Sequence, residues 1–278
     1  MTARLSGVIG WPVGHSRSPA LHGHWLARHQ IPGAYVALPV RPEDLEQVLR
    51  ALPRMGFVGC NVTVPHKEAA FHLVDHVDAA AARLGAVNTI IVRPDGTLEG
   101  RNTDGEGLVK HLQASAPDWK PADRPVLVLG AGGAARAIVG ALADIGVTEI
   151  RLANRTDARA ENLARAFGSP LKAWPWAHRE EALGGCSLVV NTTQFGMAGY
   201  DPLDLALDRL PADGVVCDIV YSPLETPLLA DARARGLVAV DGLGMLLHQA
   251  RAGFAAWFGV EPVVDEALRQ AVLGSRLP

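Results

Sequence analysis

Cysteine and long apolar runs are both scarce in this 278-residue sequence. The cysteines, Cys60, Cys186 and Cys217, are odd in number and far apart, so neither a disulfide framework nor a zinc motif is indicated. We therefore expect reduced, buried thiols in a soluble cytoplasmic protein. The amino-terminal residues lack the apolar run of a signal peptide. The most apolar long window, residues 126–147, contains an arginine, an aspartate and five glycines, so no membrane span is expected.

A marked excess of either charge is also missing. The 26 Lys and Arg residues nearly balance the 29 Asp and Glu residues, which gives a formal net charge of −3. This balance indicates neither nucleic acid nor an anionic membrane as a partner, although local arginines can still bind a small anion. The sequence does have 49% hydrophobic residues, enough for a sizeable core, and a length that suits two domains.

The first part of the chain alternates between strand and helix patterns, which is typical of an α/β unit. The first helix is expected to have Ser18 as its N-cap and Pro19 at its first position. A turn at residues 94–97 is expected to form a hairpin. Strands are expected at residues 4–12, 34–40, 56–65 and 86–93, and helices at residues 18–30, at residues 41–55 and after residue 65.

A second unit follows residues 114–125, which are rich in proline and polar side chains and have the composition of a connection. It opens with a strand, a glycine turn and a helix over residues 125–146. Further alternation of strands and helices predicts a parallel, doubly wound sheet. A last helix at residues 244–259 is expected to pack back on the first unit. Later strands are expected at residues 149–155, 187–193, 214–221 and 236–242.

The glycine turn matches the dinucleotide-binding pattern G-x-G-x-x-G/A. The strand "VLVL" precedes it and an Ala-rich helix follows, which is the context that this pattern requires. Glycines permit a tight turn and the close approach of a pyrophosphate to the helix N-terminus. This interpretation is favoured over a plain strand–helix turn. The motif consists of Gly130, Ala131, Gly132, Gly133, Ala134 and Ala135.

The end of the next strand bears on the choice of cofactor. An NAD enzyme usually carries an acid there, which binds the ribose 2′-hydroxyl. This chain instead has Asn154, Arg155 and Thr156, followed by Arg159. Guanidinium groups match phosphate oxygens, so NADP is favoured over NAD, with two solvated arginines as the alternative.

Short polar side chains gather at predicted strand ends in the first unit. In "GCNVTVPHK", Asn61 and Thr63 point to one face of a strand that Pro65 ends, and Lys67 lies just past it. Open α/β sheets bind ligands at that edge, although a lone lysine is more often a solvated charge. Several further polar groups favour a site for a polyhydroxylated acid. These are Ser16, Ser18, Asn88, Asn102 and Asp104.

The histidines indicate no metal site. His72 and His76 are four residues apart on a predicted helix, but no acid or cysteine completes a ligand set. A surface pair is therefore expected. His66 neighbours Lys67 and is a weaker candidate for acid–base chemistry.

In order along nearly the whole chain, these motifs resemble those of the shikimate dehydrogenase family. The resemblance rests on "GWPVGHSRSPALH", "GCNVTVPHK", "GAVNT", "GRNTDG", "LGAGGAARA", "NRT", "DIVYSPLETPLL" and "DGLGMLLHQA". It implies a mixed-sheet α/β substrate domain at residues 1–104, a Rossmann NADP-binding domain at residues 105–242, and C-terminal helices at residues 243–278 that return to the first domain. The implied activity is the reversible, NADPH-dependent reduction of 3-dehydroshikimate to shikimate in aromatic amino acid (chorismate) biosynthesis, by a monomer or homodimer.

The resemblance also implies roles for single residues. Lys67 is implied as the acid–base residue, paired with Asp104. Ser16 and Ser18 are implied to bind the substrate carboxylate, and serine at the second position favours shikimate over quinate. The other implied substrate-binding residues are Thr63, Lys67, Asn88, Asp104, Tyr221 and Gln249. The implied cofactor-binding residues are Gly130, Ala131, Gly132, Gly133, Ala134, Asn154, Arg155, Thr156, Arg159, Ile219, Gly242 and Met245, the last three beside the nicotinamide.

The sequence departs from the family pattern at a few positions. Gly23 stands where the family often has asparagine, and Gln194 and Phe195 replace a commoner small or proline pair near the nicotinamide. Two alternatives stay open. One is a quinate/shikimate dehydrogenase that uses NAD. The other is a non-catalytic NADP-binding sensor on the same fold, for which the loss of Lys67 or Asp104 would be expected.

Overall fold

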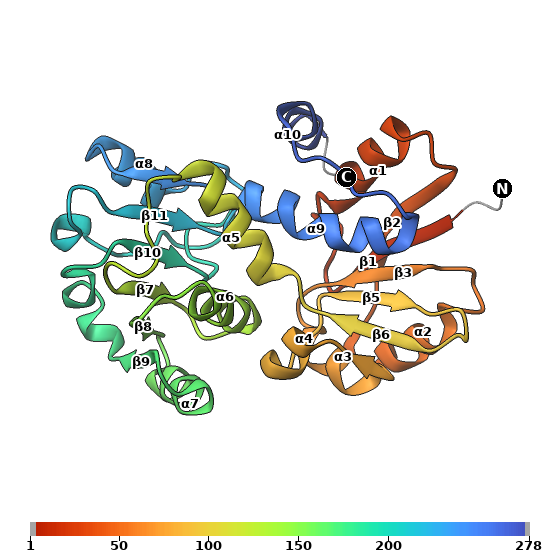
Figure 1. Cartoon of the computed structure of the whole chain (residues 1–278), viewed down its shortest axis with the longest axis horizontal. Coiled ribbons are helices and arrows are strands. Elements are labelled where there is room, and N and C mark those ends of the chain that lie inside the picture. Colours follow the sequence, from red (N-terminus) through yellow and green to blue (C-terminus); the bar gives the residue numbers. More distant parts are fainter. Residues whose placement is uncertain (1–3, 276–278) are drawn as a thin grey trace. The chain divides into compact units, whose positions relative to one another are not determined.

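The computed structural model describes residues 4–275 and divides into two compact units. Unit 1 combines the described residues up to Asp104 with those from Leu246 onward, and unit 2 comprises Gly105–Met245 (Figure 1). Helix α9, Gly242–Phe258, begins in unit 2 and continues in unit 1. The second boundary between the units therefore lies inside this helix, three residues beyond the expected division after residue 242.

Unit 1 is built on a six-stranded sheet in the order β2-β1-β3-β5-β6-β4. Strand β1 is parallel to both β2 and β3, whereas β5 is antiparallel to both β3 and β6. The mixed sheet that the resemblance implies is therefore confirmed. The strands are β1 Arg4–Gly10, β2 Gly33–Pro39, β3 Gly59–Val62, β4 His76–Val77, β5 Thr89–Val92 and β6 Leu98–Arg101.

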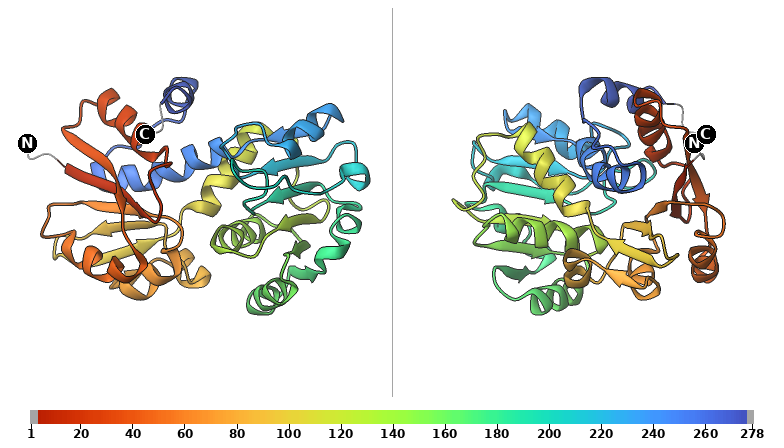
Figure 2. Two further views of the ribbon diagram at one scale, coloured as in Figure 1. Left: turned by 180° about the vertical axis from the view of Figure 1, so that it is seen from behind. Right: turned by 45° about the vertical axis from the view of Figure 1, so that its right-hand side comes forward.

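Helices cover both faces of this sheet (Figures 1 and 2). The apolar core beneath α2, α3 and α4 includes Ile9 of β1 and Val62 of β3. On the other face, Trp25 of α1 packs against Phe254 of α9, with ring centroids 5.2 Å apart. The helices are α1 Ser18–Arg28, α2 Leu45–Ala51, α3 Lys67–Leu73, α4 Ala79–Leu84, α9 and α10 Glu266–Leu273, and the 3-10 helix is η1 Pro42–Asp44.

The alternation of side chains in β3 decides which of them can reach the site. Cys60 and Val62 enter the apolar core beneath α2, α3 and α4. Asn61 therefore points to the other face, as the period of a strand requires. It is buried there and accepts a hydrogen bond from the Tyr35 hydroxyl at 2.6 Å. The strand thus places one amide on the face of the sheet opposite this apolar core.

Two expected details of unit 1 are wrong. Ser18 is the first residue of α1, and Arg17 occupies the N-cap position without a side-chain cap. Proline is tolerated throughout the first turn, where the N–H groups have no intrahelical partner, so Pro19 does not fix the cap. His76 lies in β4 and shares no helix with His72, because pairing with β6 takes the chain out of α3.

Unit 2 is built on a six-stranded, all-parallel sheet in the order β12-β11-β10-β7-β8-β9. The chain winds from β7 to β8 on one side and returns to β10 on the other, so the winding reverses at β7. Ligands bind beyond the carboxyl ends of strands at such a reversal. The doubly wound parallel sheet is confirmed. The strands are β7 Val126–Leu129, β8 Ile150–Ala153, β9 Leu171–Trp174, β10 Leu188–Asn191, β11 Val215–Asp218 and β12 Val238–Val240.

Two separate cores cover the faces of the second sheet. One contains Leu112 of α5, Ile138 of α6 and Leu163 of α7. The other contains Leu229 of α8 and Leu183 of a 3-10 helix. The helices are α5 Asp104–Ser115, α6 Gly133–Asp144, α7 Asp157–Phe167 and α8 Pro227–Ala234, and the 3-10 helices are η2 Trp176–His178, η3 Glu181–Leu183 and η4 Leu207–Arg209.

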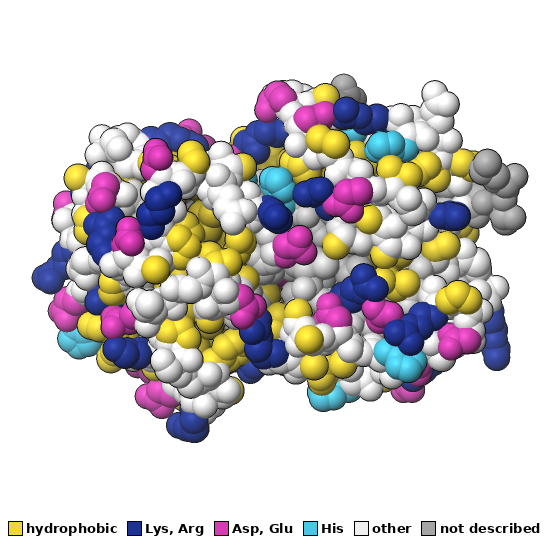
Figure 3. All heavy atoms as spheres, in the orientation of Figure 1, with side chains coloured by type: hydrophobic (Ala, Val, Ile, Leu, Met, Phe, Trp, Pro, Cys, Tyr) yellow, Lys and Arg dark blue, Asp and Glu magenta, His cyan; other side chains and the backbone are white. Residues whose placement is uncertain are grey.

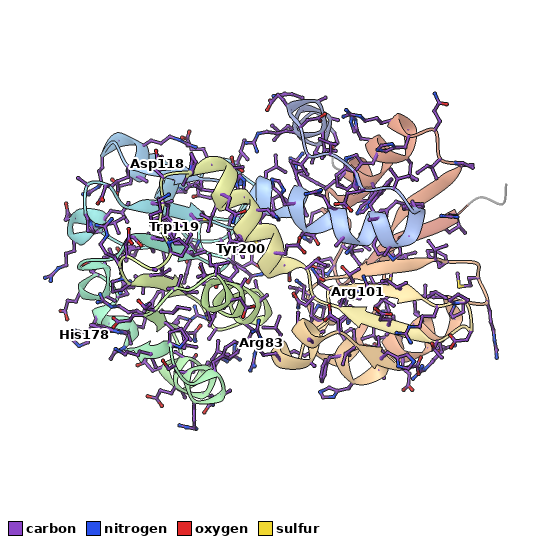
Figure 4. The ribbon with its side chains drawn as sticks, viewed as in Figure 1. Arg83, Arg101, Asp118, Trp119, His178 and Tyr200 are labelled. Atoms are coloured by element: carbon purple, nitrogen blue, oxygen red, sulfur yellow. The ribbon has the colours of Figure 1, made fainter. Side chains whose placement is uncertain are left out.

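The expected connection at residues 114–125 belongs to unit 2 instead of preceding it. Helix α5 runs through Ser115, and the indole of Trp119 then donates a hydrogen bond to Ser187 Oγ at 3.0 Å (Figure 4). Trp119 also packs against the core that contains α5 and α6. Ala116 lies in the same core and Arg124 pairs with Asp213, so these contacts fix a segment whose composition alone predicts a linker.

Side chains of both charges are interspersed over the face shown in Figure 3, as the net charge of −3 leads us to expect. No helix within the described part of the chain has the length and apolar character needed to cross a bilayer.

Candidate active site

Lys67 and Asp104 form a hydrogen-bonded ion pair in unit 1. Lys67 is the first residue of α3, just beyond β3, and Asp104 follows β6. The Lys67 ammonium donates to Asp104 Oδ2. Only 17% of the Lys67 side chain and 9% of the Asp104 side chain are exposed. Because water is largely excluded, each charge depends on the other for its solvation.

Asn88 holds the second oxygen of that carboxylate. Its side-chain amide donates to Asp104 Oδ1 at 2.8 Å, and its own oxygen accepts the Thr103 backbone N–H at 2.9 Å. Gln249 Oε1, from α9, lies 3.4 Å from both Asn88 Nδ2 and Thr103 Oγ1. Lys67, Asn88, Asp104 and Gln249 are thus one cluster, assembled from β-strand ends and a helix far away in the sequence.

The loop after β1 carries the two serines. The Ser16 N–H donates to Val13 O at 3.0 Å, and Ser16 Oγ accepts the Ser18 N–H at 3.3 Å. Thr63 lies beside the start of this loop, because β1 and β3 are parallel neighbours. A Cβ atom added to Gly10 would be only 2.5 Å from Thr63 Cγ2, so this approach requires glycine.

Arg17, between the two serines, is directed toward α10. Its guanidinium donates to Val272 O at 2.6 Å and lies 3.4 Å from Leu273 O, at the last turn of that helix. A cation is favoured at this end of a helix. Sequence reasoning missed the contact because nothing local signals a partner 255 residues away.

Two histidines near the cluster are buried and take part in the packing of the fold. His66 is 1% exposed, and its Nε2 lies 2.8 Å from Val40 O. His22 is fully buried and stacks on Tyr35 with ring centroids 4.0 Å apart. Burial lowers the pKa of His22 from 6.5 to about 3, so this ring stays neutral.

In unit 2, the glycine turn leaves an open cradle at the end of β7. Gly130 has φ +108°, and a Cβ there would be 2.4 Å from Thr192 Oγ1. A Cβ on Gly132 would meet nothing within 4 Å, so the backbone there is accessible. Gly132 is the N-cap of α6, and no side chain caps that helix. The first-turn N–H groups are therefore available to an anion, and these residues fit a pyrophosphate.

The loop after β8 presents arginine and no acid. Asn154 Nδ2 donates to Thr156 O at 2.9 Å, and Arg155 and Arg159 are exposed. The Arg155 guanidinium lies 6.0 Å from the centroid of the Phe195 ring, within reach of a cation–π interaction. Phe195, a departure from the family pattern, thus contacts an arginine of the loop after β8.

The remaining predicted residues lie around the end of β11 in unit 2. Ile219 and Met245 contact the same apolar core, and Tyr221 is partly buried. Gly242 begins α9, where a Cβ would be 2.2 Å from Ile219 O. Tyr221 therefore belongs to unit 2, whereas the other predicted substrate residues belong to unit 1.

The buried acid Asp218, at the end of β11, was not predicted from the sequence. Asp218 ends β11 and accepts hydrogen bonds from Asn191 Nδ2 at 3.0 Å, Val220 N at 3.0 Å and Thr226 Oγ1 at 2.7 Å. Burial raises the pKa of Asp218 from 3.8 to about 6, against the opposing effect of these donors. The carboxyl ties β10, β11 and the start of α8 together.

Comparison with known proteins agrees with this architecture. Three family descriptions match in order: "Shikimate dehydrogenase substrate binding domain" at residues 8–90, "Shikimate / quinate 5-dehydrogenase" at residues 112–196 and "Shikimate 5′-dehydrogenase C-terminal domain" at residues 242–273. The shikimate dehydrogenase (NADP(+)) of Paramagnetospirillum magneticum is 62% identical over 271 residues, which cover 98% of each chain.

Two solved structures are also similar. Shikimate 5-dehydrogenase from Thermus thermophilus, in complex with NADP(H) and shikimate, has a TM-score of 0.87 and 38% identity over 97% of this chain and 98% of that one. Quinate dehydrogenase from Corynebacterium glutamicum, in complex with NAD, has a TM-score of 0.90 and 32% identity over 98% of this chain and 99% of that one. The family matches and the full-length similarity together confirm the resemblance: the chain belongs to the shikimate dehydrogenase family.

Proposed function

We propose that this protein catalyses the reversible, NADP-dependent interconversion of 3-dehydroshikimate and shikimate, a step of aromatic amino acid (chorismate) biosynthesis. The observation that carries the proposal is the shielded cluster of Lys67, Asp104 and Asn88, in a chain 62% identical to a shikimate dehydrogenase (NADP(+)) over 98% of its length. Lys67 and Asp104 are both present, which argues against a non-catalytic sensor.

Lys67 is proposed as the proton donor to the ketone oxygen in the direction of reduction. NADPH, when bound, supplies the hydride. The ammonium is held in place by Asp104, and Asp104 is held by Asn88, so the donor is oriented before the substrate arrives. Such preorganisation contributes to general acid–base catalysis because a misplaced donor transfers its proton poorly.

The substrate is proposed to lie between the serine loop after β1 and the cluster that contains Lys67 and Asp104. Ser16 and Ser18 suit a carboxylate, with Thr63 beside them, because short hydroxyls can donate to its oxygens. The Arg17 guanidinium is bonded to α10, so the carboxylate is proposed to bind the serines instead of this arginine. The groups proposed to bind the ring hydroxyls are Lys67, Asn88, Asp104 and Gln249. Tyr221, a residue of unit 2, is proposed like Thr63 to lie beside the carboxylate.

NADP is proposed to bind at the carboxyl ends of the strands of unit 2. The open cradle at Gly132 and the uncapped N-terminus of α6 support a pyrophosphate there. The exposed Arg155 and Arg159 support a 2′-phosphate, and the absence of an acid among residues 154–156 disfavours NAD. Other residues proposed to contact the cofactor are Gly130, Ala131, Gly133, Ala134, Asn154, Thr156, Ile219, Gly242 and Met245.

Side-by-side kinetics of shikimate and quinate, each with NADP and with NAD, test the proposal. We expect kcat/KM for shikimate with NADP to exceed that for quinate by at least about tenfold, or about 1.4 kcal/mol. Comparable values, or faster oxidation of quinate with NAD, would overturn the substrate and cofactor assignments and favour the quinate alternative. The quinate dehydrogenase among the similar structures makes this the comparison to perform first.

The cytoplasmic location and the homodimer stay predictions. Light scattering of the purified protein would measure the oligomeric state.

A further inference from the structure

A chain of buried hydrogen bonds leads from the interior of unit 1 to the Lys67–Asp104 pair. It begins at the Tyr35 hydroxyl on β2, which donates to Asn61 Oδ1 at 2.6 Å. Asn61 Nδ2 then donates to Thr89 Oγ1 at 3.1 Å. Thr89 Oγ1 donates to Asn88 Oδ1 at 3.0 Å, and Asn88 Nδ2 donates to Asp104 Oδ1 at 2.8 Å.

Two backbone groups fix the direction of this chain. The Thr103 N–H can only donate, so its 2.9 Å contact identifies the Asn88 atom that it meets as oxygen. The Asn88 backbone carbonyl can only accept, so its 3.1 Å contact identifies the Asn61 atom as nitrogen. Thr89 receives the Asn61 N–H and has one hydrogen of its own, which it gives to Asn88. Every donor therefore points toward Asp104.

Burial makes this direction costly to reverse. Tyr35 is 7% exposed, Asn61 6%, Asn88 2% and Thr89 1%, so water cannot replace a lost partner. A flipped Asn88 amide would turn its oxygen toward the Asp104 carboxylate and its NH₂ toward the Thr103 N–H. Both contacts would be repulsive, and buried polar groups left without partners are strongly unfavourable.

We propose that Tyr35, Asn61 and Thr89 are positioning residues for the reaction. They hold the Asn88 amide with its N–H toward Asp104, which leaves Asp104 Oδ2 for the Lys67 ammonium. None of the three was among the residues assigned to substrate or cofactor. This inference rests on the proposed function of Lys67 and Asp104. It also explains why β2, β3 and β5 each carry a buried polar side chain in a sheet whose other face is apolar.

Thr89→Val is the variant that tests the proposal, because valine keeps the shape and removes the hydroxyl. We expect kcat for shikimate oxidation to fall at least about tenfold, with a smaller change in the shikimate dissociation constant, since misplaced catalytic groups commonly cost that much. Thr89→Ser restores the hydroxyl and is expected to recover kcat. Thr97→Val removes a hydroxyl that bonds only to Asp95 in the β5–β6 turn, and it serves as the matched control.

Nuclear magnetic resonance of the side-chain NH₂ of Asn88, assigned through its backbone, provides a readout that does not depend on activity. In wild-type protein and in Thr89→Ser, this NH₂ is expected to exchange slowly with solvent. In Thr89→Val its signals are expected to shift and its exchange to quicken at least about tenfold, because the amide loses one of its fixed partners.

Unchanged NH₂ signals together with kcat equal to that of Thr89→Ser would overturn the proposal. If Thr89→Val does not fold, as judged by circular dichroism, Tyr35→Phe decides by the same two measurements, since it removes the hydroxyl at which the chain begins. Failure of the proposed function is distinguishable, because the wild-type protein would then fail to oxidise shikimate while the NH₂ signals still report on the hydrogen-bond chain.

Discussion

Asp218 allows the cost of burying a carboxylate in unit 2 to be measured. The carboxyl is fully buried, and burial raises its pKa from 3.8 to about 6 despite three hydrogen-bond donors. The free energy of unfolding of the wild-type protein should fall as pH rises, because the Asp218 carboxyl must ionise while buried. We predict that Asp218→Asn abolishes this dependence on pH. Asparagine keeps the acceptor for Asn191 and Val220, and its NH₂ can donate to the Thr226 hydroxyl, so the fold is expected to persist.

The direction in which stability changes with pH depends on whether the folded or the unfolded chain binds the Asp218 proton more tightly. The folded chain keeps the Asp218 proton up to about pH 6, whereas the unfolded chain loses it near pH 3.8. The contribution to stability is therefore fully present below pH 3.8 and is lost as pH rises through about 6. At about 1.4 kcal/mol per pH unit the total is about 3 kcal/mol, of which about 2 kcal/mol falls between about pH 4.5 and about pH 7.5.

Urea denaturation of the wild-type protein and of Asp218→Asn, across about pH 4.5 to 7.5, measures this change. The free energy of unfolding of the variant, relative to wild type, is expected to rise by about 2 kcal/mol over that range. Asp213→Asn is the matched control. Asp213 accepts a hydrogen bond from Arg124 that lowers its pKa below 3.8, so it stays ionised in both the folded and the unfolded chain over this range, and the relative stability of this variant should hardly vary with pH.

A relative stability of Asp218→Asn that does not vary with pH would refute the reasoning. Carbon-13 resonances of the Asp218 carboxyl provide a direct check, since they follow its titration in the folded protein. A midpoint near the ordinary aspartate value would show that the three donors compensate for burial in full.

Three further predictions concern the cofactor and the catalytic step. Lys67→Ala is expected to lower kcat by about 10²–10⁴-fold, as general acid–base groups contribute that much, while calorimetry still detects shikimate binding. Near-normal kcat would reject the role, and Lys110→Ala, an exposed lysine of α5, is the control. Arg155→Ala is expected to weaken NADP binding about tenfold or more and NAD binding little, because a charge-assisted contact is worth about 1.5–3 kcal/mol. Equal losses for both cofactors would show that the arginine only shapes its loop. Gly130→Ala is expected to lower the stability of unit 2 by about 1–3 kcal/mol, because φ +108° strains any other residue and the Thr192 hydroxyl lies only 2.4 Å from the Cβ position. Gly132→Ala, which has open space, should melt as wild type does, and equal melting of both variants would contradict the argument.

The strand-end polar groups could be predicted because they depend only on local pattern. Lys67 follows a strand that a proline ends, Asn88 directly precedes β5 and Asp104 follows β6, so their positions at strand ends required no knowledge of long-range contacts. Their hydrogen bonds now place them together. Their roles in catalysis and binding stay predictions.

Contacts between distant segments could not be predicted. Arg17 meets Val272 across 255 residues, and no motif around the two serines signals that helix. Tyr35 meets Asn61 only because β1 lies between and aligns their strands, which is a property of the folded register. Strand β4 has two residues, too few for an alternating pattern to be recognised.

The discontinuous make-up of unit 1 dictates an order of events during synthesis. Unit 2 leaves the ribosome as one continuous stretch, Gly105–Met245, and can complete its sheet as soon as β12 has emerged. Unit 1 must wait for α9, whose Trp257 donates to Ile90 O at 2.9 Å and whose Phe254 packs on α1. Until then, the face of its sheet that α9 covers has only α1 packed on it. The dinucleotide fold therefore matures first on the nascent chain, and the cluster that Gln249 completes is assembled last.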